Sequence, residues 1–485
     1  MGGRVRALLA LAFAAAICGP AGVSAAEAPL QERLDAALGH RGLRGARVAA
    51  LVVDPADGSV LYARNPDRPL VPASNMKVLT AIAALSRFGP SHRFTTELLA
   101  DAPADDEGAV QNLYVRGGGD PVLTSEDMWR IAADLHRGGL RRVKGELLLD
   151  AGRFDNERWH PSWGRVSARA YHAPVSALTV NYGAYAVQVT PGAKRGAPVT
   201  VVIDPDVPFL RPANRAQTGP ARGRDTLRVD RRPVTGGEEV LVGGLLRLGT
   251  PPAVLHRSVL DPVGYAGAVL RMQLAAVGIR VDGDTRRGTV PEQAALLLGF
   301  QGKSVAEIAR LFLKYSNNAI AESLVKAMGV SPQAGPASWS AGLAAMRQEL
   351  AGLGIAVDPI QLVDGSGLSY ENKVSPRSFV EALKLARLSF RFGPEFVAAL
   401  PIAAADGTLK NRADGAALEV RAKTGLLTQV TGLSGYAERS DGSVVVFSVL
   451  TNGWRGSAQA AMDGVDAFVA ELVDGADEDG TELGG

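Results

Sequence analysis

The pattern of the chain changes between residues 96 and 300, and this change constrains the fold more than any single motif. Before it, residues 47–54 predict a buried strand, residues 55–58 a turn and residues 59–63 a returning strand. Within it, short β-like runs alternate with Gly- and Pro-rich breaks. After it, helical periodicity returns at residues 305–313. The pattern predicts a helix-and-sheet domain that is interrupted by a long β-rich insertion.

Both ends of the chain supply elements of this interrupted domain. Three adjacent antiparallel strands are expected over residues 418–424, 428–437 and 443–451, with a tight turn at Ser440-Asp441-Gly442. Helices are expected over residues 319–325, from Ser375-Pro376 onward, and over residues 458–472. We therefore expect the two ends of the chain to fold together around the insertion.

The N-terminus is typical of an export signal. Arg4 and Arg6 precede an apolar run at residues 7–17, and small residues at 23–26 provide a cleavage site. The alternative is an N-terminal membrane anchor, but the run is short for a membrane span. Residues 1–26 are therefore excluded from the fold, and the mature chain is expected in the periplasm or elsewhere in the extracytoplasmic envelope.

The composition excludes several kinds of partner and site. The chain is 46% hydrophobic and carries 52 basic against 50 acidic residues, so no overall charge favours nucleic acid or an anionic membrane. Its one cysteine, Cys18, lies in the expected signal peptide. Its six histidines lack metal-binding spacing. We expect no metal, no cofactor, no nucleic acid and at most peripheral contact with a membrane.

The stretch Ser74-Asn75-Met76-Lys77 carries the first sign of chemistry. It follows Pro72 and leads into an apolar run at residues 78–85 that favours a helix. Residues three apart on a helix are neighbours, so the serine hydroxyl would lie beside the lysine amine. Such a pair can activate a nucleophile without histidine. Taken alone, the stretch is better explained by a helix-capping serine and a solvated lysine.

Two further short motifs strengthen the catalytic interpretation. Ser316-Asn317-Asn318 lies between two expected helices, and Lys423-Thr424-Gly425 lies at the end of an expected strand. Together with S-x-x-K, these S-x-N and K-T-G motifs form the set found in serine enzymes that work through an acyl intermediate. Each triplet is weak by itself, but their order, their expected elements and the export signal agree.

The residue types suit acyl transfer. Ser74 Oγ would attack a carbonyl carbon, and Lys77 would accept its proton. A free lysine has a pKa of about 10.4, so Lys77 requires burial or a second nearby cation to be neutral. Lys423 is the candidate for that cation and would also attract a substrate carboxylate.

The remaining motif residues have supporting roles in this scheme. Ser316 would relay a proton to the leaving nitrogen, and Asn318 would hold the lysine base and the substrate amide. Gly425 would let the substrate backbone lie close to the strand edge. The backbone N–H groups of Ser74 and Leu426 are the candidates for an oxyanion hole.

With these motifs the chain resembles the D-Ala-D-Ala carboxypeptidase/endopeptidase family of low-molecular-mass class C penicillin-binding proteins. The resemblance extends over residues 28–473 and includes the stretches 117–121, 173–181 and 364–369. It implies removal of the terminal D-Ala from peptidoglycan stem peptides, cleavage of D-Ala–diaminopimelate cross-links and acylation by penicillin. The implied partners are peptidoglycan stem peptides and inhibitory β-lactam antibiotics, with a homodimer left open.

The resemblance also implies a multi-domain α/β fold. A serine β-lactamase/DD-transpeptidase-like domain, with an antiparallel sheet flanked by helices, is expected to be split by a large β-rich two-domain insertion. The expected divisions are a signal peptide at 1–26, the catalytic domain at 27–95 and 303–473, inserted domain II at 96–116 and 184–302, inserted domain III at 117–183, and a disordered tail at 474–485.

Three positions depart from the family pattern and concern specificity. Leu426 replaces a hydroxyl residue after K-T-G, so Thr424 and Thr428 are expected to bind more of the substrate carboxylate. Tyr370 replaces an arginine, and Arg165 replaces an acidic residue near Trp163. We expect the enzyme to favour a modified or differently charged third residue in the stem peptide.

A cluster of arginines interrupts the balanced charge of the chain. Its members are Arg222, Arg224, Arg228, Arg231 and Arg232. A solvated surface is the default interpretation, and contact with an anionic cell-wall polymer is the alternative.

Two other functions stay open at this point. A β-lactamase would need rapid deacylation, and no glutamate in a deacylation motif is evident. A non-catalytic cell-wall binding module would not require the intact set of motif residues. That set consists of Ser74, Lys77, Ser316, Asn318 and Lys423.

Overall fold

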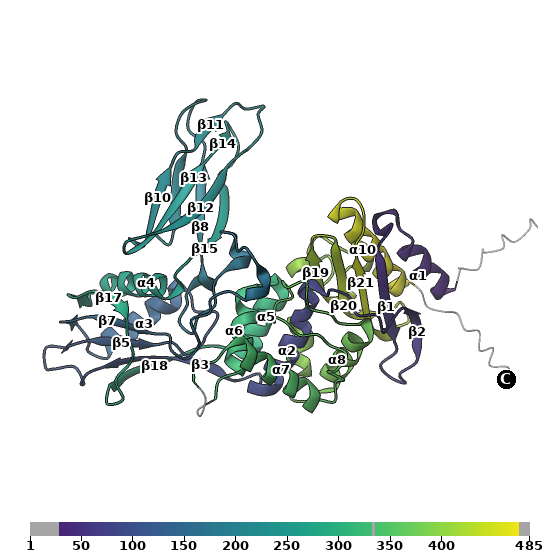
Figure 1. The fold of residues 1–485 in the computed structure, drawn as a ribbon, viewed down its shortest axis with the longest axis horizontal. Helices are drawn as coiled ribbons and strands as arrows, with labels where there is room; N and C mark the ends of the chain where they lie inside the picture. The colour runs from purple at the N-terminus through teal and green to yellow at the C-terminus, as the bar shows by residue number, and fades with distance from the viewer. Residues whose placement is uncertain (1–28, 332–334, 475–485) are drawn as a thin grey trace, which may run out of the picture.

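The computed structural model describes residues 29–331 and 335–474 of the 485-residue chain. A body of helices and sheet lies at one end of an elongated molecule, the insertion lies at the other end, and an arm of strands projects from it (Figure 1). The expected signal peptide lies outside the described residues, as does the expected tail apart from Asp474. Asp474 is the last residue of helix α10 (Ala458–Asp474).

The body is built on a five-stranded antiparallel sheet in the order β19-β20-β21-β1-β2. The strands are β19 (Val420–Leu427), β20 (Val430–Glu438), β21 (Val444–Asn452), β1 (Arg47–Val53) and β2 (Val60–Arg64). Arg47 of β1 pairs with Asn452 of β21, and the register continues to Val53 with Val446. The beginning and the end of the chain therefore form one sheet, as the sequence pattern indicates.

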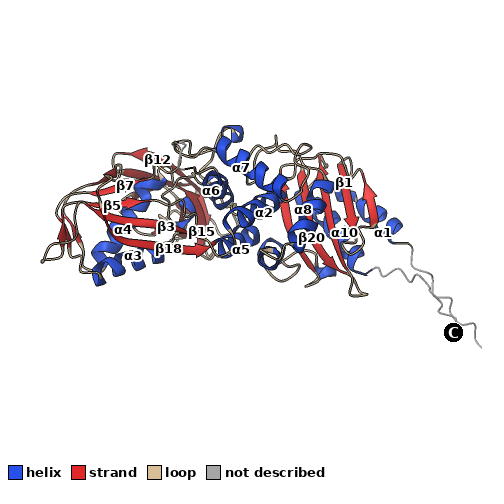
Figure 2. Ribbon diagram, turned by 90° about the horizontal axis from the view of Figure 1, so that it is seen from below, coloured by secondary structure: helices blue, strands red, loops and turns tan. Residues whose placement is uncertain are grey.

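Helices cover both faces of this sheet because successive strand residues point to opposite sides. Val48, Ala50 and Val52 pack in a core with α10 and α1 (Leu30–Leu38). Ala49, Leu51 and Val53 pack in the core on the other face, where α2 (Met76–Phe88) lies. Figure 2 shows the sheet between these helices.

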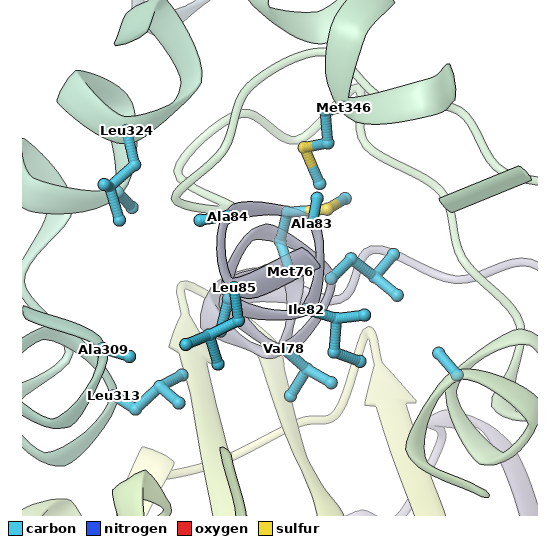
Figure 3. Packing of buried hydrophobic residues seen from close by; sticks show 14 of the residues in the cluster. Met76, Val78, Ile82, Ala83, Ala84, Leu85, Ala309, Leu313, Leu324 and Met346 are labelled. Carbon is cyan, nitrogen blue, oxygen red and sulfur yellow. The ribbon is translucent and has the colours of Figure 1, made fainter. Parts of the chain in front are cut away.

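Helix α2 lies at the centre of the larger core. The surrounding helices are α5 (Val305–Tyr315), α6 (Asn318–Met328), α7 (Trp339–Gly352), α8 (Pro376–Leu388) and α9 (Gly393–Ala399). Figure 3 shows Met346 of α7, Leu324 of α6 and Leu313 of α5 on different sides of α2. A helix that is apolar on all sides is buried, so the start of α2 is held in a fixed place.

The expected helices of the body are present, and the body also contains three helices that the sequence pattern did not predict, α1, α7 and α9. Helices α5, α6 and α10 cover the expected ranges, and Ser375 caps α8 with Pro376 in its first turn. Helix α7 was not predicted, because its many alanines and glycines weaken the apolar periodicity.

The insertion contains a mixed sheet in the order β17-β7-β5-β3-β18. Its strands are β17 (Thr285–Arg287), β7 (Leu147–Asp150), β5 (Leu113–Arg116), β3 (Arg93–Ala100) and β18 (Ala295–Ser304), and a small sheet joins β16 (Arg280–Val281), β6 (Arg142–Val143) and β4 (Ala109–Val110). Helices α3 (Ser125–Arg137) and α4 (Pro262–Ala276) pack on each other. The sequence pattern missed both helices, although the Thr124/Asp127 capping box of α3 is a local helix signal.

The arm consists of three small sheets. The first has the order β15 (Ala253–Ser258), β8 (Ala184–Thr190), β9 (Thr200–Asp204). The second has the order β10 (Leu210–Asn214), β13 (Gly237–Gly243), β12 (Arg228–Val234). The third joins β11 (Gln217–Gly219) to β14 (Leu245–Arg247). The expected division of the insertion at residues 116 and 183 does not match the sheets. Strand β7, from the range expected as domain III, lies between β17 and β5, because its leucines pair with both neighbours. The mixed α/β class is as expected.

None of the helices in the described part of the chain combines the length and the apolar character that a membrane span requires.

Candidate active site

Ser74 lies in a short 3-10 turn, Ala73–Asn75, immediately before α2. Ala73 has a left-handed backbone with φ of 47°, and Asn75 Nδ2 donates to the Pro72 carbonyl at 3.1 Å. No side chain caps the start of α2 by a hydrogen bond. The interpretation of Ser74 as a helix cap is therefore wrong.

Two glycines allow this turn to pack closely against the rest of the body. A Cβ on Gly367 would lie 1.8 Å from the Ala73 carbonyl oxygen, and one on Gly425 would lie 2.6 Å from the Pro72 carbonyl oxygen. The structure thus gives Gly425 a packing role behind the turn, where the sequence suggested space for a substrate backbone. A side chain at either position would displace the segment that carries Ser74.

Lys77 has three polar partners. Its Nζ lies 3.1 Å from Ser74 Oγ, 2.7 Å from Asn318 Oδ1 and 2.7 Å from the Ser366 carbonyl oxygen. A neutral amine has two N–H groups and one lone pair. The side-chain oxygen of Asn318 and the carbonyl oxygen of Ser366 can only accept hydrogen bonds, so they receive the two N–H groups of Lys77. The lone pair of Lys77 then faces the Ser74 hydroxyl. This is the arrangement that a general base requires.

Burial lowers the pKa of Lys77 to about 7, although the Asp364 and Glu322 carboxylates oppose this shift. The sequence suggested two causes, burial and the charge of Lys423, and the structure gives burial as the cause. A base with a pKa near neutrality can accept the serine proton at physiological pH.

Glu322 and Asp364 fix the loop that contacts Lys77. Glu322 Oε1 accepts from the Ser366 N–H at 2.7 Å, and its Oε2 accepts from Trp339 Nε1 at 2.8 Å. Asp364 accepts from the backbone of Gly367 and Ser369, from Asn372 and from Trp163 Nε1. In the sequence, the 364–369 stretch stood out only through the family resemblance, and its contact with Lys77 was not predicted. Hydrogen bonds between distant segments leave no local sequence pattern.

The S-x-N motif lies at the junction of α5 and α6. Ser316 ends α5 in a left-handed conformation with φ of 56°, and the Asn317 side chain caps α6 by accepting from the Ile320 N–H. Asn318 accepts from Lys77 and donates from Nδ2 to the Tyr171 carbonyl at 3.0 Å. Asn318 therefore joins the body to the insertion at the site.

The K-T-G motif lies on β19, and its lysine is more deeply buried than expected. Lys423 is 0% exposed, and its Nζ donates to the Thr424 carbonyl at 2.7 Å. Burial, followed by the Lys77 charge, lowers the pKa of Lys423 well below its usual value. Thr424 Oγ1 donates to Thr408 Oγ1 at 2.7 Å. Neither Lys423 nor Thr424 lines the cavity in front of Ser74.

The cavity in front of Ser74 has a volume of about 470 Å³. The expected residues that line it are Ser74, Ser316, Asn318, Tyr370, Leu426 and Thr428. Trp163, Tyr171 and His172 from the insertion also line it and were not assigned to the site from the sequence. Tyr370 OH accepts from the Thr428 N–H at 3.0 Å, which joins two of the specificity positions. Arg165 lies outside this cavity and lines another one.

The arrangement has the parts needed for acyl transfer by serine. A hydroxyl contacts a buried amine whose pKa is near 7, and an adjacent cavity can hold a substrate. Among the residues that the structure describes, no group of three or more His, Cys, Asp or Glu side chains could hold a metal ion. The fold and this site together define a serine hydrolase that forms an acyl-enzyme.

Comparison with known proteins identifies the family. Residues 30–472 match the D-Ala-D-Ala carboxypeptidase 3 (S13) family, and the chain therefore belongs to it. The D-alanyl-D-alanine carboxypeptidase of Actinomadura sp. is 38% identical over 462 residues, which cover 92% of this chain and 84% of that protein. DacB of Haemophilus influenzae is 27% identical over 398 residues, which cover 79% and 81% of the two chains. The activity class of the chain is that of a D-Ala-D-Ala carboxypeptidase.

A solved structure shows the same fold. Penicillin binding protein 4 of Haemophilus influenzae superposes with a TM-score of 0.78 at 24% identity, covering 90% of this chain and 98% of that protein. The similarity spans both the body and the insertion, so the split arrangement is a feature of this fold.

Proposed function

We propose that the chain is a serine-type D-Ala-D-Ala carboxypeptidase in which Ser74 is the nucleophile and Lys77 the general base. The contact between Ser74 Oγ and Lys77 Nζ at 3.1 Å, in a site where burial lowers the lysine pKa to about 7, carries this proposal. The substrate class is the stem peptide of peptidoglycan, which ends in D-Ala-D-Ala.

In the first half of the reaction, Ser74 Oγ attacks the carbonyl carbon of the penultimate D-Ala, and its proton moves to Lys77 Nζ. The backbone N–H groups of Ser74 and Leu426 stabilise the oxyanion. The C–N bond then breaks, and the proton passes from Lys77 through the Ser316 hydroxyl to the leaving amine of the terminal D-Ala. The product is an ester between the shortened peptide and Ser74.

In the second half, water attacks the ester carbonyl and gives its proton to Lys77. The ester bond breaks, Ser74 Oγ recovers a proton from Lys77, and the shortened peptide leaves with a free carboxylate. Asn318 holds Lys77 through Oδ1 during both steps. Its Nδ2 retains one N–H for the substrate amide after donating to Tyr171.

The terminal carboxylate of the substrate is assigned to Thr428, which lines the cavity, whereas Thr424 lies on β19 outside the cavity lining. The Lys423 amine lies 3.4 Å from Thr424 Oγ1, and burial, which lowers its pKa, favours the neutral amine there. Leu426 lines the cavity where relatives of this type commonly carry a hydroxyl, so the backbone at Thr428 and the Tyr370 hydroxyl complete the polar wall.

Substitution of the nucleophile tests the assignment directly. Ser74→Ala should reduce peptide turnover by at least about 10³-fold and abolish covalent labelling by penicillin, because no other hydroxyl contacts Lys77 in the described structure. Labelling is measured by intact-protein mass spectrometry, with Ser86→Ala on the same helix as the control. Undiminished trimming of stem peptides by Ser74→Ala would rule out this nucleophile.

The lifetime of the penicillin adduct on Ser74 distinguishes a carboxypeptidase from a β-lactamase. Penicillin occupies Ser74 as an acyl group, and a peptidase is expected to release it slowly. A labelled mass that disappears within seconds, with hydrolysed penicillin accumulating, would instead indicate a β-lactamase.

Endopeptidase activity on cross-links is part of the proposal. Trp163 and Tyr171 of the insertion line the cavity of about 470 Å³, so the insertion is placed to contact a second stem peptide. Digestion of purified peptidoglycan followed by mass spectrometry distinguishes the two activities. Loss of one alanine indicates carboxypeptidase activity, and conversion of dimers to monomers indicates endopeptidase activity.

The specificity positions give a further expectation. Tyr370 and Leu426 line the site without charge, so the enzyme should distinguish ordinary from amidated diaminopimelate in the third position of the stem. Comparison of kcat/KM for the two pentapeptides checks this, and equal values would contradict it.

Export is proposed from the sequence pattern of residues 1–26. N-terminal analysis of the protein recovered from the cell envelope would show whether that segment is removed, and an intact N-terminus in a membrane fraction would favour an anchor.

A further inference from the structure

A second cavity lies at the base of the arm and is lined by arginines. Its volume is about 640 Å³, and it lies between the 165–169 loop, strand β12 and strand β15. Figure 1 shows β15 at the base of the arm, near the body. The lining arginines are Arg165, Arg169, Arg228, Arg231 and Arg257. Asp230 is the single carboxylate among the residues that line it.

These arginines lack acidic partners, unlike several other arginines of the insertion. Arg232, Arg247 and Arg286 each form an ion pair with a carboxylate. Within residues 29–331 and 335–474, none of the five lining arginines does so. Arg257 donates only to the backbone carbonyls of Val229 and His256, both at 2.8 Å. The buried Nε of Arg231 has no hydrogen-bond partner in that part of the chain.

The nearby carboxylates do not neutralise this charge. Asp230 accepts a hydrogen bond from the Arg231 backbone N–H at 2.8 Å. Glu238 lies buried and accepts from the N–H groups of Leu260 and Asp261. Burial raises the pKa of Glu238, which favours its neutral form. Five guanidinium groups against the single carboxylate of Asp230 leave the lining of the cavity with a net positive charge, which favours an anionic ligand.

The arginine cavity is adjacent to the active site. Residues 165–169 line it, while Ser162, Trp163, Tyr171 and His172 from the same segment line the cavity in front of Ser74. Burial and, to a lesser extent, the charge of Arg231 lower the pKa of His172, so Arg231 in one cavity acts electrostatically on His172 in the other. A polymer held in the active site could therefore continue into the arginine cavity.

We propose that the arginine cavity binds carboxylate groups of peptidoglycan that lie outside the scissile peptide, such as those of a second stem. This rests on the proposed function, since the active site is the source of the polymer. Guanidinium groups bind carboxylates through paired N–H donors, and five of them around one cavity can hold more than one carboxylate. The cavity is thus a site for holding the wall substrate, separate from the catalytic residues.

The test uses full-length enzyme whose Ser74 has been acylated by penicillin, so that binding does not depend on turnover. Its affinity for purified insoluble peptidoglycan, stripped of attached polymers, is measured by co-sedimentation. Arg169→Gln/Arg228→Gln should weaken Kd by about tenfold, because two charged donors are lost. The matched control Arg222→Gln/Arg224→Gln removes two exposed arginines that do not line the cavity, and its Kd should change by less than about twofold.

Amidated peptidoglycan identifies the group that is bound. The unsubstituted enzyme should bind it as weakly as Arg169→Gln/Arg228→Gln binds ordinary peptidoglycan. Equal losses in the two double variants would show that only general surface charge matters, and unchanged binding to amidated wall would exclude carboxylates. Tighter binding to poly(glycerol phosphate), lost only in the cavity variant, would also overturn the proposal in favour of a phosphate polymer.

Penicillin labelling of every variant is measured first. Failure of the unsubstituted enzyme to label would count against the proposed function, and wall binding could still be measured on the unlabelled chain. Full labelling with no loss of wall binding in Arg169→Gln/Arg228→Gln would count against the arginine cavity alone.

Discussion

At the scale of single residues, the state of Lys77 decides whether Ser74 can act. The lysine is completely buried, and each of its three contacts has a defined role. Two acceptors orient the amine, and the third partner is the nucleophile. Because burial favours the neutral amine, the site converts an ordinary lysine into a base without histidine.

The pH dependence of acylation follows from this state. The pKa of Lys77 is about 7, far below the value of 10.5 for an exposed lysine, so the amine is neutral above pH 7 and charged below it. The second-order rate of penicillin acylation should therefore fall about tenfold per pH unit below pH 7 and be nearly constant above it. Stopped-flow measurements from pH 5 to 9, with circular dichroism as a control for folding, check this. A constant rate across that range would contradict the assignment of the base.

At the scale of elements, the position of Ser74 depends on the turn that precedes α2. The turn is held between the 364–369 loop and β19, where Gly367 and Gly425 leave room for the backbone. Helix α2 is buried on all sides, so a shift of the turn cannot be relieved by movement of the helix.

Replacement of Gly367 should therefore impair both stability and acylation. Gly367→Ala places a Cβ 1.8 Å from the Ala73 carbonyl oxygen at a residue with φ of 79°, and should cost about 2–5 kcal/mol in the free energy of unfolding. The control Gly442→Ala has a similar φ of 81° with no atom within 4 Å, and should cost only about 1 kcal/mol. Urea unfolding and penicillin acylation rates measure the two effects. Similar costs for both variants would mean that close packing of the turn is unimportant.

At the scale of the whole molecule, the insertion and the body share one core. Phe154, Val175 and Ala177 of the insertion belong to the same buried cluster as helix α2. Lys326 of α6 is 0% exposed, and its Nζ donates to Asp155 Oδ1 and to the Glu157 carbonyl. These contacts hold the segment that brings Trp163 and Tyr171 to the active site.

Loss of the Lys326 contacts should weaken the attachment of the insertion to the body. Lys326→Met should lower the free energy of unfolding by about 2–3 kcal/mol, because Asp155 and the Glu157 carbonyl lose their donor. Lys144→Met removes an exposed pair with Asp105 in the insertion and should change stability by less than about 0.5 kcal/mol. Denaturant unfolding of both variants checks the difference, and equal changes would show that the buried contact does not join the parts.

Local signals accounted for much of the architecture. The buried apolar strands at 47–53 and 444–452, the serine–proline start of α8 and the amphipathic α10 depend on nearby residues, so their sequence patterns were sufficient. Helices α1, α3, α4, α7 and α9 were not predicted, and strand β7 lies in one sheet with strands from the range expected as the other inserted domain. Their places depend on packing and strand pairing between distant segments, which the sequence pattern does not specify.

The sequence by itself determined the nucleophile, its base and the supporting motifs as candidates, because their spacing and element types follow from local rules. Only the tertiary structure decided that burial lowers the pKa of Lys77, that Gly425 makes room for the turn, and that Lys423 faces a backbone carbonyl. It also showed that Arg228 and Arg231 of the arginine cluster line a cavity that Arg222, Arg224 and Arg232 do not line. These properties arise from contacts between segments far apart in the chain, which exist only after folding.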